Sequence, residues 1–168
     1  GGVAPVATEA STGSELASFL AFDVTSTTIP YGSLEPGSTH PTLATSTDLI
    51  AQGNTGLDED AYGDTMCTTW SALDSCDTNG IDPTNDIVIG NQKIATSSVV
   101  YGSALAYTMT GSSSPVDLSI RIPKVTSTSS PTVGYSWWGM SVPGTITTAG
   151  SYTGRNVITA KKSNSAFW

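Results

Sequence analysis

The residues between Asp77 and Asp86 carry oxygen donors in a pattern that suits a hard metal ion. Asp77, Asn79, Asp82 and Asp86 are grouped around Gly80. Calcium-binding loops bring carboxylate and amide oxygens from alternate positions together on the ion in this way. The match to an EF-hand is partial, because the glycine comes too early and no Glu occupies the closing position. Ca²⁺ is therefore the one cofactor that the sequence suggests, and a metal-free Asx-rich turn is the alternative.

The two cysteines, Cys67 and Cys76, lie close together in a stretch that is rich in turn residues. In a chain of this composition their spacing favours one intrachain disulfide and an oxidising compartment. Two reduced, buried thiols are the alternative. A structural zinc site needs four nitrogen or sulfur ligands, which two cysteines and a single histidine do not supply.

Few residues suggest catalysis. The one histidine, His40, precedes a proline in a turn, and the chain has no GxSxG nucleophile elbow. The adjacent carboxylates Asp58, Glu59 and Asp60 could do acid–base work of the kind that glycosidases use. Acidic clusters on surface loops are far commoner than such sites. We therefore expect no enzymatic activity, and a secreted hydrolase is the most distant alternative.

The charge of the chain limits its partners. Charged residues make up 12% of the sequence, the net charge is −8 and the pI is near 4.2. Such a surface repels phosphate, so nucleic acid is not an expected partner. No apolar run of about 18 residues is present, so no membrane span is expected. The chain opens on Gly1 without an initiator Met, which suggests a mature, processed form or a trimmed fragment.

The segment Tyr135–Val142 is the strongest strand signal. Trp137 faces one way, while Trp138, Met140 and Val142 face the other, because side chains alternate along a strand. Bulky groups on both faces predict a central strand that is covered on both sides. The Pro143-Gly144 pair ends it.

Several other segments alternate between turn signals, and Val116–Pro123 does so most regularly. The remaining expected strands are Phe22–Ile29, Leu43–Ala51, Leu57–Met66, Ile87–Ile94, Ser97–Thr110 and Asn156–Ala160. Roughly eight to ten short strands with turns about every 8–12 residues predict an all-β fold, an antiparallel β-sandwich of the Ig-like or jelly-roll kind.

The chain is expected to hold one sandwich domain, residues 22–168, preceded by an extended N-terminal arm, residues 1–21. The arm contains Val3, Pro5 and Val6 and has no obvious hairpin partner nearby. Pro5 restricts it to an edge position or to the start of a strand. An arm of this kind can act as a donor strand that completes the sheet of a neighbouring copy.

Several phrases resemble uncharacterised secreted surface proteins of candidate-phyla, Parcubacteria-type, ultra-small bacteria. The phrases begin at Ile29 (IPYGSLEPG), Gln52 (QGNTGLD), Tyr62 (YGDTM), Asn91 (NQKIATS) and Tyr135 (YSWWGMSVPG). The resemblance implies a cell-surface β-sandwich without catalytic residues. A weaker analogy, in architecture alone, is to camelysin-like matrix fibres and archaeal bundling pili, in which an N-terminal strand completes the sheet of the next subunit.

These observations predict a secreted structural subunit that polymerises into an extracellular surface filament or matrix fibre by N-terminal donor-strand exchange. Its expected partners are copies of itself, with a host or neighbouring cell surface as a further one. The alternative is an adhesive or carbohydrate-binding module of the cell surface. Its sugar platform would use Trp70, Trp137 or Trp168.

Overall fold

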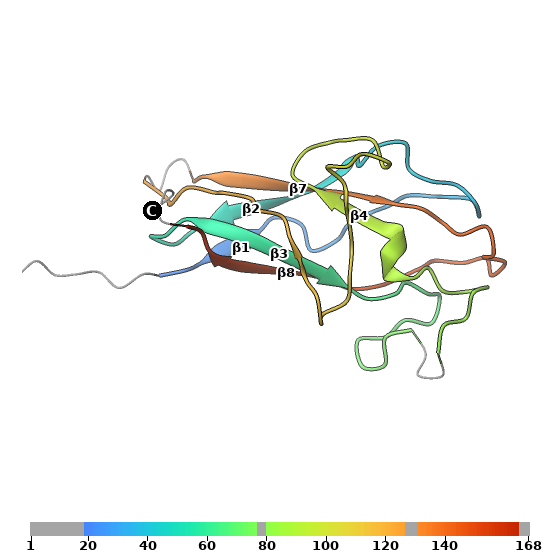
Figure 1. Ribbon diagram of the computed structural model, residues 1–168. Helices are drawn as coiled ribbons and strands as arrows, with labels where there is room; N and C mark the ends of the chain where they lie inside the picture. Colours follow the sequence, from blue (N-terminus) through green and yellow to red (C-terminus); the bar gives the residue numbers. More distant parts are fainter. Residues whose placement is uncertain (1–18, 77–79, 127–130, 165–168) are drawn as a thin grey trace, which may run out of the picture.

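The computed structural model describes residues 19–76, 80–126 and 131–164. In these residues two antiparallel sheets face each other as a β-sandwich (Figure 1), which confirms the predicted fold class. The described strands are β1 (Phe22–Val24), β2 (Thr45–Ala51), β3 (Leu57–Gly63), β4 (Gln92–Ala95), β5 (Tyr107–Thr108), β6 (Val116–Asp117), β7 (Val133–Met140) and β8 (Asn156–Lys162). A single 3-10 turn, η1 (Ile89–Asn91), leads into β4.

The larger sheet has the order β1-β2-β7-β4-β5, and the smaller has the order β6-β3-β8. Strand β7 therefore lies at the centre of the larger sheet, as its two-sided pattern predicted. Trp138 is only 1% exposed and faces the core between the sheets. Trp137 faces the outside of the sheet, where it packs against the cluster around Leu43.

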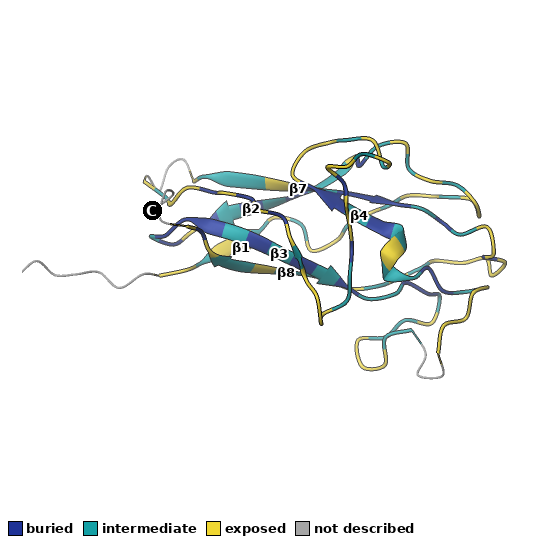
Figure 2. Ribbon diagram, viewed as in Figure 1, coloured by how far each residue is buried: buried dark blue, intermediate teal, exposed yellow. Residues whose placement is uncertain are grey.

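Apolar side chains from both sheets form the main core, which appears as the buried parts of the strands in Figure 2. Strand β3 shows why the chain folds this way. Its burial alternates strictly, so every second side chain enters the core. The buried members of this cluster are Leu49, Ala51, Leu57, Ala61, Ile94, Met109, Leu118, Ile120, Ile122 and Trp138.

Several expected strands are shorter than their patterns predicted. Of Phe22–Ile29 only Phe22–Val24 pairs, and in Ile87–Ile94 the 3-10 turn η1 stands where a strand was expected and β4 begins at Gln92. In Ser97–Thr110 only Tyr107–Thr108 pairs as a strand, and the preceding loop supplies Ala106 to the cluster that covers Trp137. In Val116–Pro123 the strand ends after Asp117, and Ser119 has a left-handed backbone with φ of 50°. The chain rejoins the sheet at Ile122, which pairs with Leu57, so the predicted inward face is kept although the strand is broken.

The described chain starts beside the turn between β2 and β3. The amides of Gln52 and Gly53 donate to Ala21 O over 2.9 and 3.1 Å. A Cβ atom on Gly53 would lie 2.1 Å from Phe19 O, so only glycine permits this close approach. Residues 19–21, assigned to the arm from the sequence, thus run along the sandwich.

Val3, Pro5 and Val6 lie outside the described residues. No helix in the described part of the chain has the length and apolar character needed to cross a bilayer.

Candidate subunit-docking groove

The disulfide predicted from the cysteine spacing is present. Cys67 and Cys76 are joined, with their Cα atoms 5.7 Å apart. Cys67 also exchanges two backbone hydrogen bonds of 3.0 Å with Thr153, so the disulfide loop is attached to the segment that leads into β8. The loop between the cysteines ends in a small bridge from Ser71 to Ser75 and presents Leu73 to solvent.

Replacing both cysteines by serine is expected to lower the free energy of unfolding by about 2–3 kcal/mol. A loop of about ten residues is closed by the bond, and the unfolded chain gains this freedom when the bond is removed. Denaturant titration measures the loss, and wild-type protein in reductant should match the variant. A titration of the unreduced, denatured protein should find no thiol; two thiols per chain, or an unchanged unfolding midpoint, would contradict the assignment.

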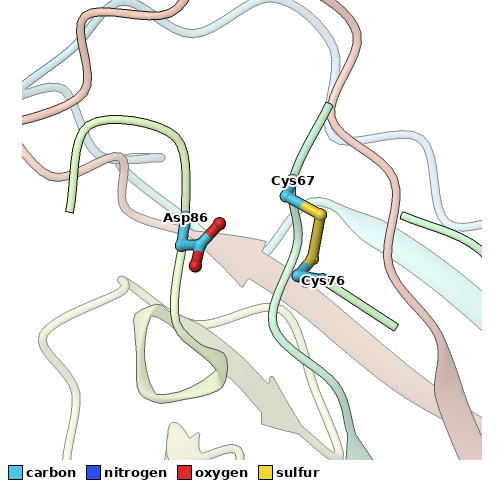
Figure 3. Close-up of side chains that lie close together, drawn as sticks. All are labelled: Cys67, Cys76 and Asp86. Carbon is cyan, nitrogen blue, oxygen red and sulfur yellow. A yellow bond between two sulfur atoms is a disulfide. The ribbon is translucent and has the colours of Figure 1, made fainter. Parts of the chain in front are cut away.

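Two of the four predicted calcium ligands lie in the described residues. Asp82 N donates to Asp86 Oδ2 over 2.8 Å, and Asp82 Oδ1 accepts from both Thr84 N and Thr84 Oγ1. The two bonds from Thr84 lower the pKa of Asp82, and the Thr84 hydroxyl contributes most. Figure 3 shows Asp86 beside the disulfide, whose sulfurs are already bonded to each other. Asp77 and Asn79 lie outside the described residues.

The calcium hypothesis therefore stays a prediction with a direct test. A bound ion stabilises the fold by mass action, so the melting temperature should rise with added calcium and fall back with chelator. The paired variant Asp82→Asn with Asp86→Asn should no longer respond. If neither calcium nor chelator changes the melting temperature of the wild type, the segment is an Asx-rich turn that binds no calcium.

The three consecutive carboxylates of β3 do not converge. Alternation along the strand sends Glu59 into the core and sends Asp58 and Asp60 to the outer face. Asp60 accepts a hydrogen bond of 2.7 Å from Lys161, which also reaches Asp117 at 2.8 Å. Glu59 therefore points away from the other two carboxylates and cannot act with either of them on one substrate, whereas Asp58 and Asp60 share the outer face.

A large cavity in the described residues is a groove between two long connections. One wall is formed by residues 27–36, which follow β1, and the other by residues 147–154, which precede β8. Strands β1 and β8 are the end strands of their respective sheets. The walls of the groove are therefore the segments that adjoin these two end strands in the chain.

Both walls offer unpaired backbone groups. Among the described residues, the amides of Ile29 and Tyr31 and those of residues 32–35 donate to no other group. Other segments hold the facing wall in place. Thr147 N and Thr148 N donate to Thr84 O, and Thr153 pairs with Cys67. Its Tyr152 and Gly154 amides donate to no described partner. The groove thus has the hydrogen-bonding character of two sheet edges.

The floor of the groove is apolar. Its buried residues Met66, Ile87, Met140, Val142 and Ile146 form a separate cluster, against which the wall residues Tyr31, Leu34 and Tyr152 pack. The cavity measures about 930 Å³, at the upper end of the range of roughly 300–1,000 Å³ for small-ligand pockets. Glu35 is the one charged residue among the described residues that line it. An apolar, uncharged segment fits such a lining best.

The single histidine holds one wall in place. Met140 N donates to His40 Nδ1 over 3.0 Å, so Nδ1 is an acceptor and the ring hydrogen is on Nε2. His40 Nε2 then donates to Tyr31 O over 2.8 Å. The imidazole therefore ties the wall at Tyr31 to the end of β7, a structural role that the turn position of His40 did not reveal.

A small cluster of polar side chains, Tyr31, Gln92 and Asn156, also lines the groove. Tyr31 Oη and Asn156 Nδ2 both donate to Gln92 Oε1 over 2.9 Å. Burial raises the pKa of the Tyr31 phenol well above its usual range, so it remains a neutral donor. These bonds connect the wall at Tyr31 to the start of β8 through Gln92 of β4.

No family model, no curated protein and no solved structure matches this chain.

Proposed function

We propose that the protein is a secreted structural subunit that polymerises into an extracellular filament or matrix fibre by N-terminal donor-strand exchange. The observation behind this proposal is the groove, whose two walls lack strand partners and whose floor is apolar. An inserted strand from another copy would give the wall amides their acceptors and cover the floor. Completion of a sheet by an added strand is a recurrent mode of peptide recognition.

The first residues of the chain suit such a groove. In an extended arm, Val3 and Pro5 project to one side and Val6 to the other, so either face presents apolar groups. Pro5 lacks an amide hydrogen and is acceptable when its nitrogen faces away from the ladder. Within residues 1–12 only Glu9 has a charged side chain, so burying the segment costs little desolvation.

The ends of the molecule support a head-to-tail contact. Figure 1 shows the described chain starting where β2 passes into β3, while the connections before β8 and after β1 run toward the opposite end. The seven residues of β3 span roughly 20–24 Å between these ends. Because donor and acceptor lie at opposite ends, the contact does not close on itself and adds copies in a line.

The disulfide and the acidic composition support the extracellular setting of the proposal, because disulfides persist in oxidising compartments. A host or neighbouring cell surface remains a further partner that the filament would meet. The alternative, an adhesive or carbohydrate-binding module, has less support. Trp137 and Trp70 are each half-buried, whereas a sugar platform needs open aromatic faces. Trp168 lies outside the described residues.

Negative-stain electron microscopy of the purified native protein is the first test. Unbranched filaments are the expected result, and uniformly monomeric particles at high concentration would contradict polymerisation. Sugar-array binding by those monomers would instead favour the adhesive module.

A further inference from the structure

Glu59 is a carboxylic acid in the centre of the sandwich. It lies at the middle of β3 between Leu57 and Ala61, and its side chain has no exposed surface. Within the described part of the chain, neither of its carboxyl oxygens makes a hydrogen bond. An ionised carboxylate is costly to bury without a partner, so the protonation state of Glu59 bears directly on the stability of the fold.

A chain of polar side chains lies on the buried face of the larger sheet, and its last member, Ser136, faces this carboxyl. Trp138 Nε1 donates to Thr47 Oγ1 over 3.0 Å, and Thr47 Oγ1 lies 2.7 Å from Ser136 Oγ. Because the indole only donates, Thr47 has its own hydrogen left for Ser136. Among the described side chains that act on the carboxyl, the Ser136 hydroxyl is the uncharged one, and in this structure it makes no hydrogen bond to either carboxyl oxygen. It can donate one hydrogen bond to a carboxylate, or accept one from the neutral acid.

The charges around Glu59 disfavour its anion. Asp58 and Asp60 flank it on β3, and both are negative. From the larger sheet the uncharged Ser136, which contacts Thr47, acts on it. On β8, Lys161 is bound to Asp60 and Asp117 on the outer face, and Lys162 is exposed.

The remaining neighbour is the stretch after β6. Its Leu118 N donates to Glu59 O over 3.0 Å, and Arg121 of the same stretch is exposed. Burial raises the pKa of Glu59 most, and the two flanking aspartates raise it further. Ser136 lowers this pKa, but the result is still a pKa of about 7.

We propose that Glu59 is held in the folded protein as a neutral acid that faces Ser136 across the sandwich, and that its ionisation loosens the sandwich as the surroundings turn from mildly acidic to neutral. The unfolded chain ionises Glu59 at the ordinary value near 4.3. Between that value and about 7 the folded state keeps a proton that the unfolded state has lost. The unfolding equilibrium constant therefore rises with pH in this window, by up to about tenfold per pH unit, and then levels off.

The test compares unfolding of the wild type with that of Glu59→Gln from about pH 4 to about pH 9. Glutamine keeps the shape and the capacity to hydrogen-bond Ser136 but does not titrate, so the variant should show a flatter profile. Near pH 8 it should unfold with an equilibrium constant roughly a hundredfold smaller than that of the wild type. The matched control Asp48→Asn removes a carboxylate from the outer face of β2 and should keep the wild-type profile.

Parallel profiles for the wild type and Glu59→Gln would overturn the proposal, as would a variant that is less stable by the same amount at every pH. If Glu59→Gln does not fold, infrared spectroscopy of the wild type decides instead. The carbonyl band of a protonated carboxylic acid should persist at pH 6 (about 2 units above the usual glutamate pKa) and disappear on unfolding. Its absence from the folded protein would equally overturn the proposal.

Discussion

Removing residues 1–10 is expected to convert the filaments into folded monomers. The deletion takes away Val3, Pro5 and Val6, which supply the proposed contacts, and leaves every described residue in place. The groove then has no donor, while the core and the disulfide are unchanged. Sedimentation and negative-stain microscopy measure the loss of polymer, and the circular dichroism spectrum should remain that of the wild type.

A synthetic peptide of residues 1–12 is the matched control. Added to the truncated protein, it should bind with a stoichiometry of about one and raise the melting temperature by mass action. A peptide with Val3 and Val6 both replaced by Asp should not bind, because charges in an apolar groove are costly. If the truncated protein still forms filaments of normal morphology, the donor-strand mechanism is wrong.

Placing a charge in the groove should abolish assembly from the acceptor side. Leu34 is a half-buried wall residue that packs against the apolar floor. Leu34→Glu puts a carboxylate beside the incoming arm, and burying it unpaired costs about 3 kcal/mol or more, which weakens each contact at least roughly a hundredfold. The matched control is Val100→Glu, which changes a 58% exposed valine outside the groove and should assemble normally.

Mixing the two defective proteins separates the donor from the acceptor. The Leu34→Glu protein keeps its arm, and the truncated protein keeps its groove. Together they should form a one-to-one complex that grows no further, whereas each alone stays monomeric. Light scattering coupled to size exclusion measures this. Failure to form the complex, with both proteins folded, would show that arm and groove do not recognise each other.

The arm could also reach the groove of its own copy. Eighteen residues extend to roughly 60 Å, longer than the distance along β3. In that case the wild type would be a stable monomer and residues 1–10 would act as a permanent plug. The truncation would then lower stability without affecting the oligomeric state, an outcome that microscopy and denaturant titration together distinguish from polymerisation.

The central strand and the disulfide could be predicted because their signals are local. The alternation of Trp137 and Trp138 fixes two faces within a few residues, and both faces are covered as expected. Cys67 and Cys76 are close in sequence, so the short segment between them keeps the two sulfurs near each other in most conformations. The same alternation placed Leu118, Ile120 and Ile122 in the core even where regular pairing is broken.

The groove walls could not be predicted, because they depend on contacts between distant residues. Residues 29–37 signal turns, and nothing local shows that His40 ties them to Met140 about a hundred residues later. The sequence predicts Glu59 as one of three acidic surface residues, because the run Asp58–Asp60 does not itself show which of the three shares a face with Leu57 and Ala61. The sequence predicts a strand before Tyr107 because this segment is rich in aliphatic residues. In the structure those residues belong to a loop that covers Trp137.

A helical reconstruction of the filament by electron cryomicroscopy tests the central claim most directly. We predict an extended segment of backbone density in the groove between residues 27–36 and 147–154, continuous with residue 19 of the neighbouring copy. Side-chain density for one of the arm valines should lie over Met140 and Ile146. A filament in which the groove is empty, or is filled by the arm of the same copy, would contradict the account.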